Sequence, residues 1–212
     1  MTRIIDLTHP ITADMPVYPG TTPPVIEVAN TVAEHGFLEH RLTMVTHTGT
    51  HIDAPAHMLA GGRTLDTYPA DTFVGPATVL DVSAVTGAIG REFLESHRDL
   101  IVGQAFLLLH TGWSARWGDE SYFRNYPALT VEAAAWLGEF GLRGVGLDAV
   151  SIDCSGSTDF AIHHEVMSRE MLIIENLTNL GKLAGREFTL LCLPLLLNGA
   201  DGAPARAVAL VD

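Results

Sequence analysis

The chain has 212 residues, of which 47% are hydrophobic and only 17% are charged, so it can bury a sizeable core and is not a disordered chain. Its 25 acidic residues outnumber its 12 basic residues and give a net charge of −13, which argues against nucleic acid or an anionic membrane surface as a partner. Two cysteines, Cys154 and Cys192, are too few for a disulfide framework or a cysteine-rich zinc module, whereas ten histidines are many for this length.

The N-terminal sequence MTRIIDLTHPIT lacks the basic and then apolar segments of a secretory signal. The longest apolar runs, such as the one at 191–197, are much shorter than the ~20 residues that a membrane-spanning helix needs. No repeat or long linker divides the chain. We therefore expect a cytoplasmic protein with one domain over residues 1–212.

The first forty residues are rich in proline. Each proline fixes φ and removes a backbone donor, so this segment should form short strands and turns and no long helix. An arm or a surface wrap would suit it. The prolines concerned are Pro10, Pro16, Pro19, Pro23 and Pro24.

Short apolar runs bounded by turn residues predict a sheet along the rest of the chain. Residues 37–46 mix aromatic and β-branched residues and predict a strand that leads into the sequence HTGTHIDAPAH. Buried strands are predicted at 77–83, 105–111, 144–150, 171–175, 188–195 and 207–211. Helices are predicted at 91–97, 131–140 and 162–171. In the second helix Thr130 is the expected N-cap and Gly141 the expected stop. The pattern predicts a mixed α/β domain with a substantial sheet and a few helices, and it does not define the strand order.

Three histidines and one aspartate lie within the eleven residues 47–57. Imidazole and carboxylate groups are ligands for Zn²⁺, Mn²⁺ and related ions. A glycine and a proline inside the segment exclude a regular helix, so we expect a shaped loop. Residues two apart share a side of an extended chain, so His51 and Asp53 can converge on one ion, while Gly49 lets the backbone bring His47 towards them. The alternative is that these imidazoles bind no metal and only make hydrogen bonds. The density of the group argues against this alternative.

The segment resembles the H-x-G-T-H-x-D-x-P-x-H signature of the cyclase-like metal-dependent hydrolases, the family of the bacterial kynurenine formamidase and isatin hydrolase type. The resemblance covers nearly the whole chain, through IIDLTHPITADMPVYPG, LLLHTGW, ENLTNL and LPLLLNGADGAPARAVAL. It implies the family's swivelling β/β/α fold and assembly as a homodimer or homotetramer. It also implies one or two divalent metal ions per chain, with Zn²⁺ the first expectation and Mn²⁺ the second.

The resemblance also implies roles for individual residues of the loop. His47, His51 and Asp53 match the family's metal ligands, and His57 matches its catalytic acid/base. Asp153 is expected only to shape a loop near the site.

Two further ligand positions of the family are a histidine and, twelve residues later, a glutamate in a block like IIENL. Counting back twelve residues from Glu175 gives His163. Side chains of adjacent helical residues diverge by about 100°, so only one of His163 and His164 can face the site, and His164 is left as a supporting or merely hydrogen-bonded residue. Isatin-hydrolase-like members carry an amide where this chain has Glu175, so its carboxylate favours two ions, with Asp53 and Glu175 as candidate bridges.

The activity that the resemblance implies is metal-dependent amide hydrolysis of a small molecule. A divalent ion lowers the pKa of bound water from ~15.7 to about 7, and the resulting hydroxide can attack a carbonyl. His57 would carry a proton from this water to the leaving nitrogen. The expected substrate is N-formylkynurenine, an intermediate of tryptophan catabolism. With this substrate the protein would be an arylformamidase. The alternatives are hydrolysis of a cyclic amide or lactone such as an isatin-like ring, and a metal- or ligand-binding protein without turnover, against which the presence of His57 argues.

Overall fold

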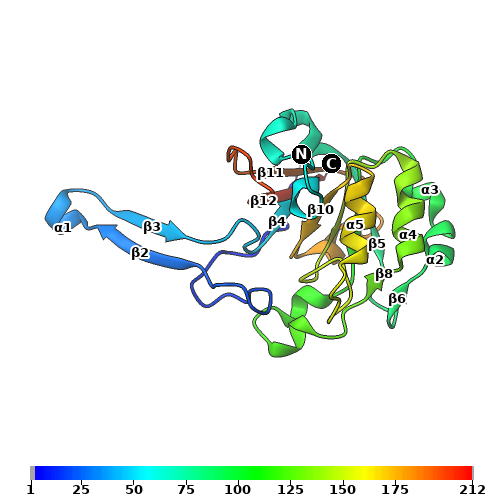
Figure 1. Ribbon diagram of the computed structural model, residues 1–212, viewed down its shortest axis with the longest axis horizontal. Coiled ribbons are helices and arrows are strands. Elements are labelled where there is room, and N and C mark those ends of the chain that lie inside the picture. The colour runs from blue at the N-terminus through cyan, green and yellow to red at the C-terminus, as the bar shows by residue number, and fades with distance from the viewer. Residues whose placement is uncertain (1–2, 212) are drawn as a thin grey trace.

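The computed structural model describes residues 3–211, whose main sheet curves round and closes on itself like a barrel (Figure 1). Its strands pair in the order β1, β12, β11, β5, β7, β9, β10, β4. They span β1 Arg3–Asp6, β4 His51–Asp53, β5 Val74–Asp81, β7 Phe106–His110, β9 Gly144–Leu147, β10 Leu172–Glu175, β11 Phe188–Pro194 and β12 Gly202–Val211. The ring closes because β4, at the end of this series, also pairs with the first residues of β12.

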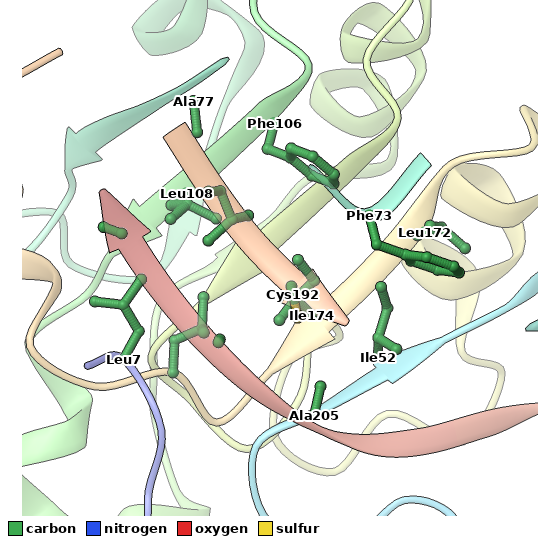
Figure 2. Packing of buried hydrophobic residues seen from close by; sticks show 14 of the residues in the cluster. Leu7, Ile52, Phe73, Ala77, Phe106, Leu108, Leu172, Ile174, Cys192 and Ala205 are labelled. Atoms are coloured by element: carbon green, nitrogen blue, oxygen red, sulfur yellow. The ribbon is translucent and has the colours of Figure 1, made fainter. Parts of the chain in front are cut away.

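Alternating side chains on the strands separate two buried apolar clusters. In β7, Phe106 and Leu108 belong to the cluster inside the barrel, whereas Leu107 and Leu109 belong to the cluster on the opposite face, beneath the helices. Figure 2 shows the inner cluster, where Leu108 and neighbouring side chains from other strands gather. Both faces of these strands are covered, which explains why their sequences are continuous apolar runs.

The helices α2 to α5 lie on one side of the sheet, and the predicted helices at 91–97, 131–140 and 162–171 are confirmed with shorter bounds (Figure 1). They span α2 Arg91–Glu95, α3 Arg98–Ile101, α4 Val131–Leu137 and α5 Ala161–Ser168. The Thr130 hydroxyl accepts a hydrogen bond from the backbone N–H of Ala133 and so caps α4 as predicted. In the part of the chain that the structure describes, seven short 3-10 helices lie at Pro55–His57, Leu65–Thr67, Ala70–Phe73, Trp113–Arg116, Glu120–Phe123, Gly138–Phe140 and Leu180–Leu183. Within residues 3–211, no helix has the length and apolarity to cross a membrane.

The predicted buried strands are confirmed as β5, β7, β9, β10, β11 and β12. The last strand is longer than predicted, because residues 202–204 pair with β4 although they include a glycine and a proline, and pairing with β11 begins at Ala205. Two further strands of two residues each, β6 Ala88–Ile89 and β8 Ala128–Leu129, form a separate parallel pair.

The strand predicted at 37–46 is β3 Glu39–Thr43, which pairs with β2 Val25–Asn30 in a hairpin that extends away from the barrel (Figure 1). The short helix α1 Val32–His35 forms its tip, and Gly36, at a φ of +83°, ends that helix. We call residues 25–43 the arm. The sequence analysis expects an arm or a surface wrap within the first forty residues, and the arm covers the end of this segment, after its last proline.

Candidate metal centre

Strands β4 and β10 bring three predicted ligands to one face of the sheet. His51 and Asp53 lie on either side of Ile52, which points into the inner cluster, so both of them point away from it. Glu175 ends β10 directly opposite His51 in the antiparallel register. The His51 Nε2 atom lies 3.1 Å from Asp53 Oδ1 and 3.7 Å from Glu175 Oε2. All three side chains are buried.

His163 of α5, and not His164, completes this group. Its side chain is buried together with those of Val166 and Met167, whereas His164 is exposed. The His163 Nε2 atom lies 3.4 Å from Glu175 Oε1 and 3.9 Å from Asp53 Oδ2. The structure therefore places the predicted histidine at the site.

Asp153 lies behind His163 and orients it. Its Oδ2 atom accepts a hydrogen bond from His163 Nδ1, and the carboxylate also accepts from the backbone N–H groups of Ile162 and His163 at the start of α5. A histidine whose Nδ1 donates in this way presents the lone pair of Nε2 to a metal. The sequence predicts only a loop-shaping role for Asp153. The signal that could have revealed this contact is the position of Asp153, ten residues before His163 and shortly before the helix that carries His163.

His47 reaches the same group from the loop before β4. Its Nδ1 atom lies 2.6 Å from Asp53 Oδ1, and its Nε2 atom lies 3.0 Å from Asp201 Oδ2. The ring lies so close to Gly202 that a Cβ atom at that position would be 2.4 Å from His47 Cε1. The loop turns at Gly49, whose φ of +65° few other residues adopt readily.

His57 stands at the edge of the group, at the end of a 3-10 helix that begins at Pro55. Its ring centroid lies 3.8 Å from that of His47, and its Nδ1 atom lies 3.5 Å from Asp201 Oδ2. Thr46 donates a hydrogen bond to the other oxygen of Asp201. Asp201 is not among the sequence-predicted site residues, and only its place in the block LPLLLNGADGAPARAVAL could have drawn attention to it.

Among the described residues the donor atoms form three triads, each with three ligand atoms within 4.8 Å of one another. Two of them share the buried carboxylate of Asp53, and they are His47, His51 and Asp53, and Asp53, His163 and Glu175. The third, of His47, His57 and Asp201, is only partly buried. The Asp53 side chain is fully buried, and its Oδ2 atom has no hydrogen-bond partner among the described residues. Since an unpartnered buried carboxylate oxygen is costly, these residues fit a divalent cation, and the shared carboxylate allows for two.

The electrostatics of the group also favour a bound positive charge. Burial alone would lower the pKa of His47, but hydrogen bonds to Asp53 and Asp201 outweigh it and raise the pKa to about 9. Asp153 and Glu175 likewise overcome the burial of His163 and raise its pKa to about 10. Without a metal, the positive charge that neutralises the carboxylates comes from protonated imidazoles. A bound divalent cation would supply this positive charge instead. His57 differs, because burial lowers its pKa.

A cavity of about 570 Å³ opens over these residues, a size typical of small-molecule sites. His57 and the residues of the two triads that share Asp53 form its polar wall. The rest of the lining includes seven apolar side chains, some of them from the proline-rich N-terminal segment. They are Pro16, Val17, Tyr18, Val45, Met58, Val150 and Phe160.

Comparisons with known proteins identify the family of this chain. The Cyclase family model matches residues 5–154. Kynurenine formamidase from Bacillus cereus is 37% identical over 205 residues, which are 96% of this chain and 95% of that protein. Isatin hydrolase A from Ralstonia solanacearum has 30% identity and a TM-score of 0.89, over 100% of this chain and 92% of its own. A structure described as a predicted metal-dependent hydrolase from Bacillus stearothermophilus has 32% identity and a TM-score of 0.82, over 99% and 98% of the two chains.

Proposed function

Because this chain belongs to the Cyclase family and is a metal-dependent hydrolase, we propose that it hydrolyses N-formylkynurenine to formate and kynurenine. The observation that carries this proposal is the pair of ligand triads that share Asp53, with His57 beside them in one cavity. The 37% identity to a kynurenine formamidase over nearly the whole chain supports the choice of substrate.

A divalent cation held by the two triads supplies Lewis acidity, which acidifies water and polarises a carbonyl group. The protein's own groups orient the ligands and move the proton. His57 accepts a proton from the attacking water and returns it to the aryl nitrogen as the C–N bond breaks. With Nδ1 turned to Asp201, Nε2 is the nitrogen of His57 that exchanges this proton. Because burial lowers its pKa, His57 is neutral and able to accept at neutral pH.

Hydrolysis of a cyclic amide is the second candidate. The similarity to isatin hydrolase A favours it, since that protein has the same fold at 30% identity. Glu175 favours N-formylkynurenine as the substrate. In the family that the chain resembles, isatin-hydrolase-like members have an amide side chain at this position. The same catalytic groups serve both reactions, since each adds water to a carbonyl and breaks a C–N bond.

The test is turnover by the purified protein after its bound metal has been quantified. N-formylkynurenine and isatin are assayed in parallel, before chelation, after chelation and after return of Zn²⁺ or Mn²⁺. Hydrolysis of N-formylkynurenine that chelation abolishes and one of these metals restores is the expected result. Faster hydrolysis of isatin would replace the proposed substrate with the second candidate. Bound metal without turnover of either would reject both and leave a metal-binding protein.

We further propose that the arm binds a second copy of this chain, as in a homodimer or homotetramer. An isolated two-stranded hairpin is marginally stable in water, and the arm exposes Val28, Val32, Phe37 and Leu38 to more than half their full extent. The loop between β11 and β12 adds an exposed apolar patch on the barrel, at Leu195–Leu197. Contact between arms, or between an arm and this patch, would bury surfaces that a single copy leaves in water.

The cytoplasm remains the proposed location. Cys154 and Cys192 are both free thiols, which suits a reducing compartment. Fractionation of the native host would test this assignment.

A further inference from the structure

Asn176 follows Glu175 and occupies an unusual position beside the metal centre. Its φ is +57°, in the left-handed region that few residues other than glycine and asparagine adopt readily. Its backbone N–H donates to Ala149 O, and its backbone carbonyl accepts from the Thr50 hydroxyl. The side chain is buried and makes two further hydrogen bonds, neither of which stabilises a helix or a strand.

The first of these bonds links Asn176 to the metal-binding loop. Its Nδ2 atom donates to the carbonyl oxygen of Gly49 over 3.0 Å. The same oxygen accepts from His51 Nδ1 over 2.8 Å. A carbonyl can only accept, so Nδ1 of His51 carries a proton, and Nε2, which faces Asp53 and Glu175, is the nitrogen that can bind a metal. The position of one backbone oxygen therefore sets the orientation of a predicted ligand.

The second bond fixes the amide of Asn176. The Tyr122 hydroxyl donates to Asn176 Oδ1 over 2.7 Å, and the tyrosine is fully buried. Burial raises the pKa of the Tyr122 phenol, so it stays a neutral donor. If the amide were flipped, its oxygen would face the oxygen of Gly49, which has no hydrogen to donate. The amide therefore has one orientation, with its NH₂ group on Gly49.

We infer that Asn176 is a positioning residue for the metal centre, which transmits the fixed position of Tyr122 through the Gly49 carbonyl to the imidazole of His51. This inference rests on the metal site of the proposed function. It adds three hydrogen bonds, from Tyr122 to Asn176, from Asn176 to Gly49 and from His51 to Gly49, which support a ligand of that site. Residues that support metal ligands in this way typically contribute about 10–100-fold to metal affinity.

The decisive variant is Asn176→Gly, because glycine deletes the amide and still adopts a positive φ without strain. Asn179→Gly is the matched control. Asn179 also has a positive φ, of +61°, and its amide also donates to a backbone carbonyl, that of Asp6, outside the metal centre. The dissociation constant of Zn²⁺ is measured by competition with a chromogenic chelator, without substrate. The His51 Nδ1–H proton of the zinc-loaded protein is followed by ¹⁵N-edited NMR.

Asn176→Gly is expected to weaken Zn²⁺ binding about 10–100-fold and to speed exchange of the His51 Nδ1–H proton with water, whereas Asn179→Gly changes neither. Should Asn176→Gly not fold, Tyr122→Phe decides, because it removes only the hydroxyl and should produce the same two changes. Unchanged zinc affinity and proton exchange in a folded variant would overturn the inference. Failure of the unmodified protein to bind zinc or manganese would instead overturn the proposed function, so the two failures are distinguishable.

Discussion

His51 and Glu175 lie directly opposite each other on β4 and β10, with 3.7 Å between His51 Nε2 and Glu175 Oε2. The strands that carry them also close the barrel, because β4 pairs with β10 on one side and with β12 on the other. A slip of one residue in either pairing would turn a ligand into the inner cluster and an apolar side chain towards the cavity. The geometry of the metal centre is thus tied to the register of the sheet.

Asp53→Asn tests the carboxylate that both triads share. The variant keeps the size of a fully buried side chain but removes its negative charge. Bound metal measured by elemental analysis should fall to near zero, because both triads lose their common ligand. Asp81→Asn, an exposed position outside the triads, should keep its metal. Metal retained at full stoichiometry in Asp53→Asn would remove Asp53 from the ligand set.

His57→Ala separates proton transfer from metal binding. His57 belongs only to the partly buried triad with His47 and Asp201, so the variant should retain the metal held by the two triads that share Asp53. Its kcat for N-formylkynurenine should fall by about 10²–10⁴-fold, the usual contribution of a general acid/base. Normal turnover with full metal content would contradict this role.

His163→Ala and His164→Ala form a pair in which each variant controls for the other. The first deletes a buried imidazole that faces Glu175, and the second deletes an exposed one on the same helix. His163→Ala should lose metal and activity, whereas His164→Ala should remain close to the unmodified protein in both. The reverse ranking would show that α5 presents its other face to the metal.

Gly202→Ala tests the close approach of β12 to His47. The new Cβ atom would lie 2.4 Å from His47 Cε1, so the ring or the backbone of β12 must shift from its present position. We expect a loss of about 1–3 kcal/mol in the free energy of unfolding, typical of overpacking, together with weaker metal binding. Gly90→Ala adds the same methyl group where nothing lies within 4 Å, and should change neither quantity. Equal metal affinity in the two variants would argue against a role of this contact in placing His47.

Phe37→Asp tests the arm as the surface that binds a second copy. Sedimentation equilibrium should show an oligomer for the unmodified protein and a dissociation constant raised at least about tenfold in the variant, because a charge replaces an apolar contact. Val102→Asp is the control, since Val102 is 54% exposed against 51% for Phe37 and follows α3, remote from the arm (Figure 1). A monomeric unmodified protein, or equal dissociation constants in the two variants, would contradict the proposal.

Much of the fold could be predicted from local patterns. The apolar runs define most strands because a strand that is covered on both faces must be apolar at successive positions. Thr130 marks the start of α4 because its side chain can satisfy a free backbone N–H there. The sequence also determined the chemistry of the centre, because three imidazoles and a carboxylate within residues 47–57 have few uses other than a cation site. The resemblance to the cyclase-like hydrolases, whose ligand histidine precedes a glutamate by twelve residues, implies His163 for the same site.

Only the tertiary structure decided which groups surround these side chains. Asp201 and Asn176 lie far along the chain from the motif, and they contact it because β10 and β12 both pair with β4, whereas Asp153 contacts His163 of α5. Strand order, barrel closure and the resulting hydrogen bonds depend on contacts between distant segments, which no local pattern records. The residue types determined that a metal can bind, and the register of the sheet decided how its ligands are held.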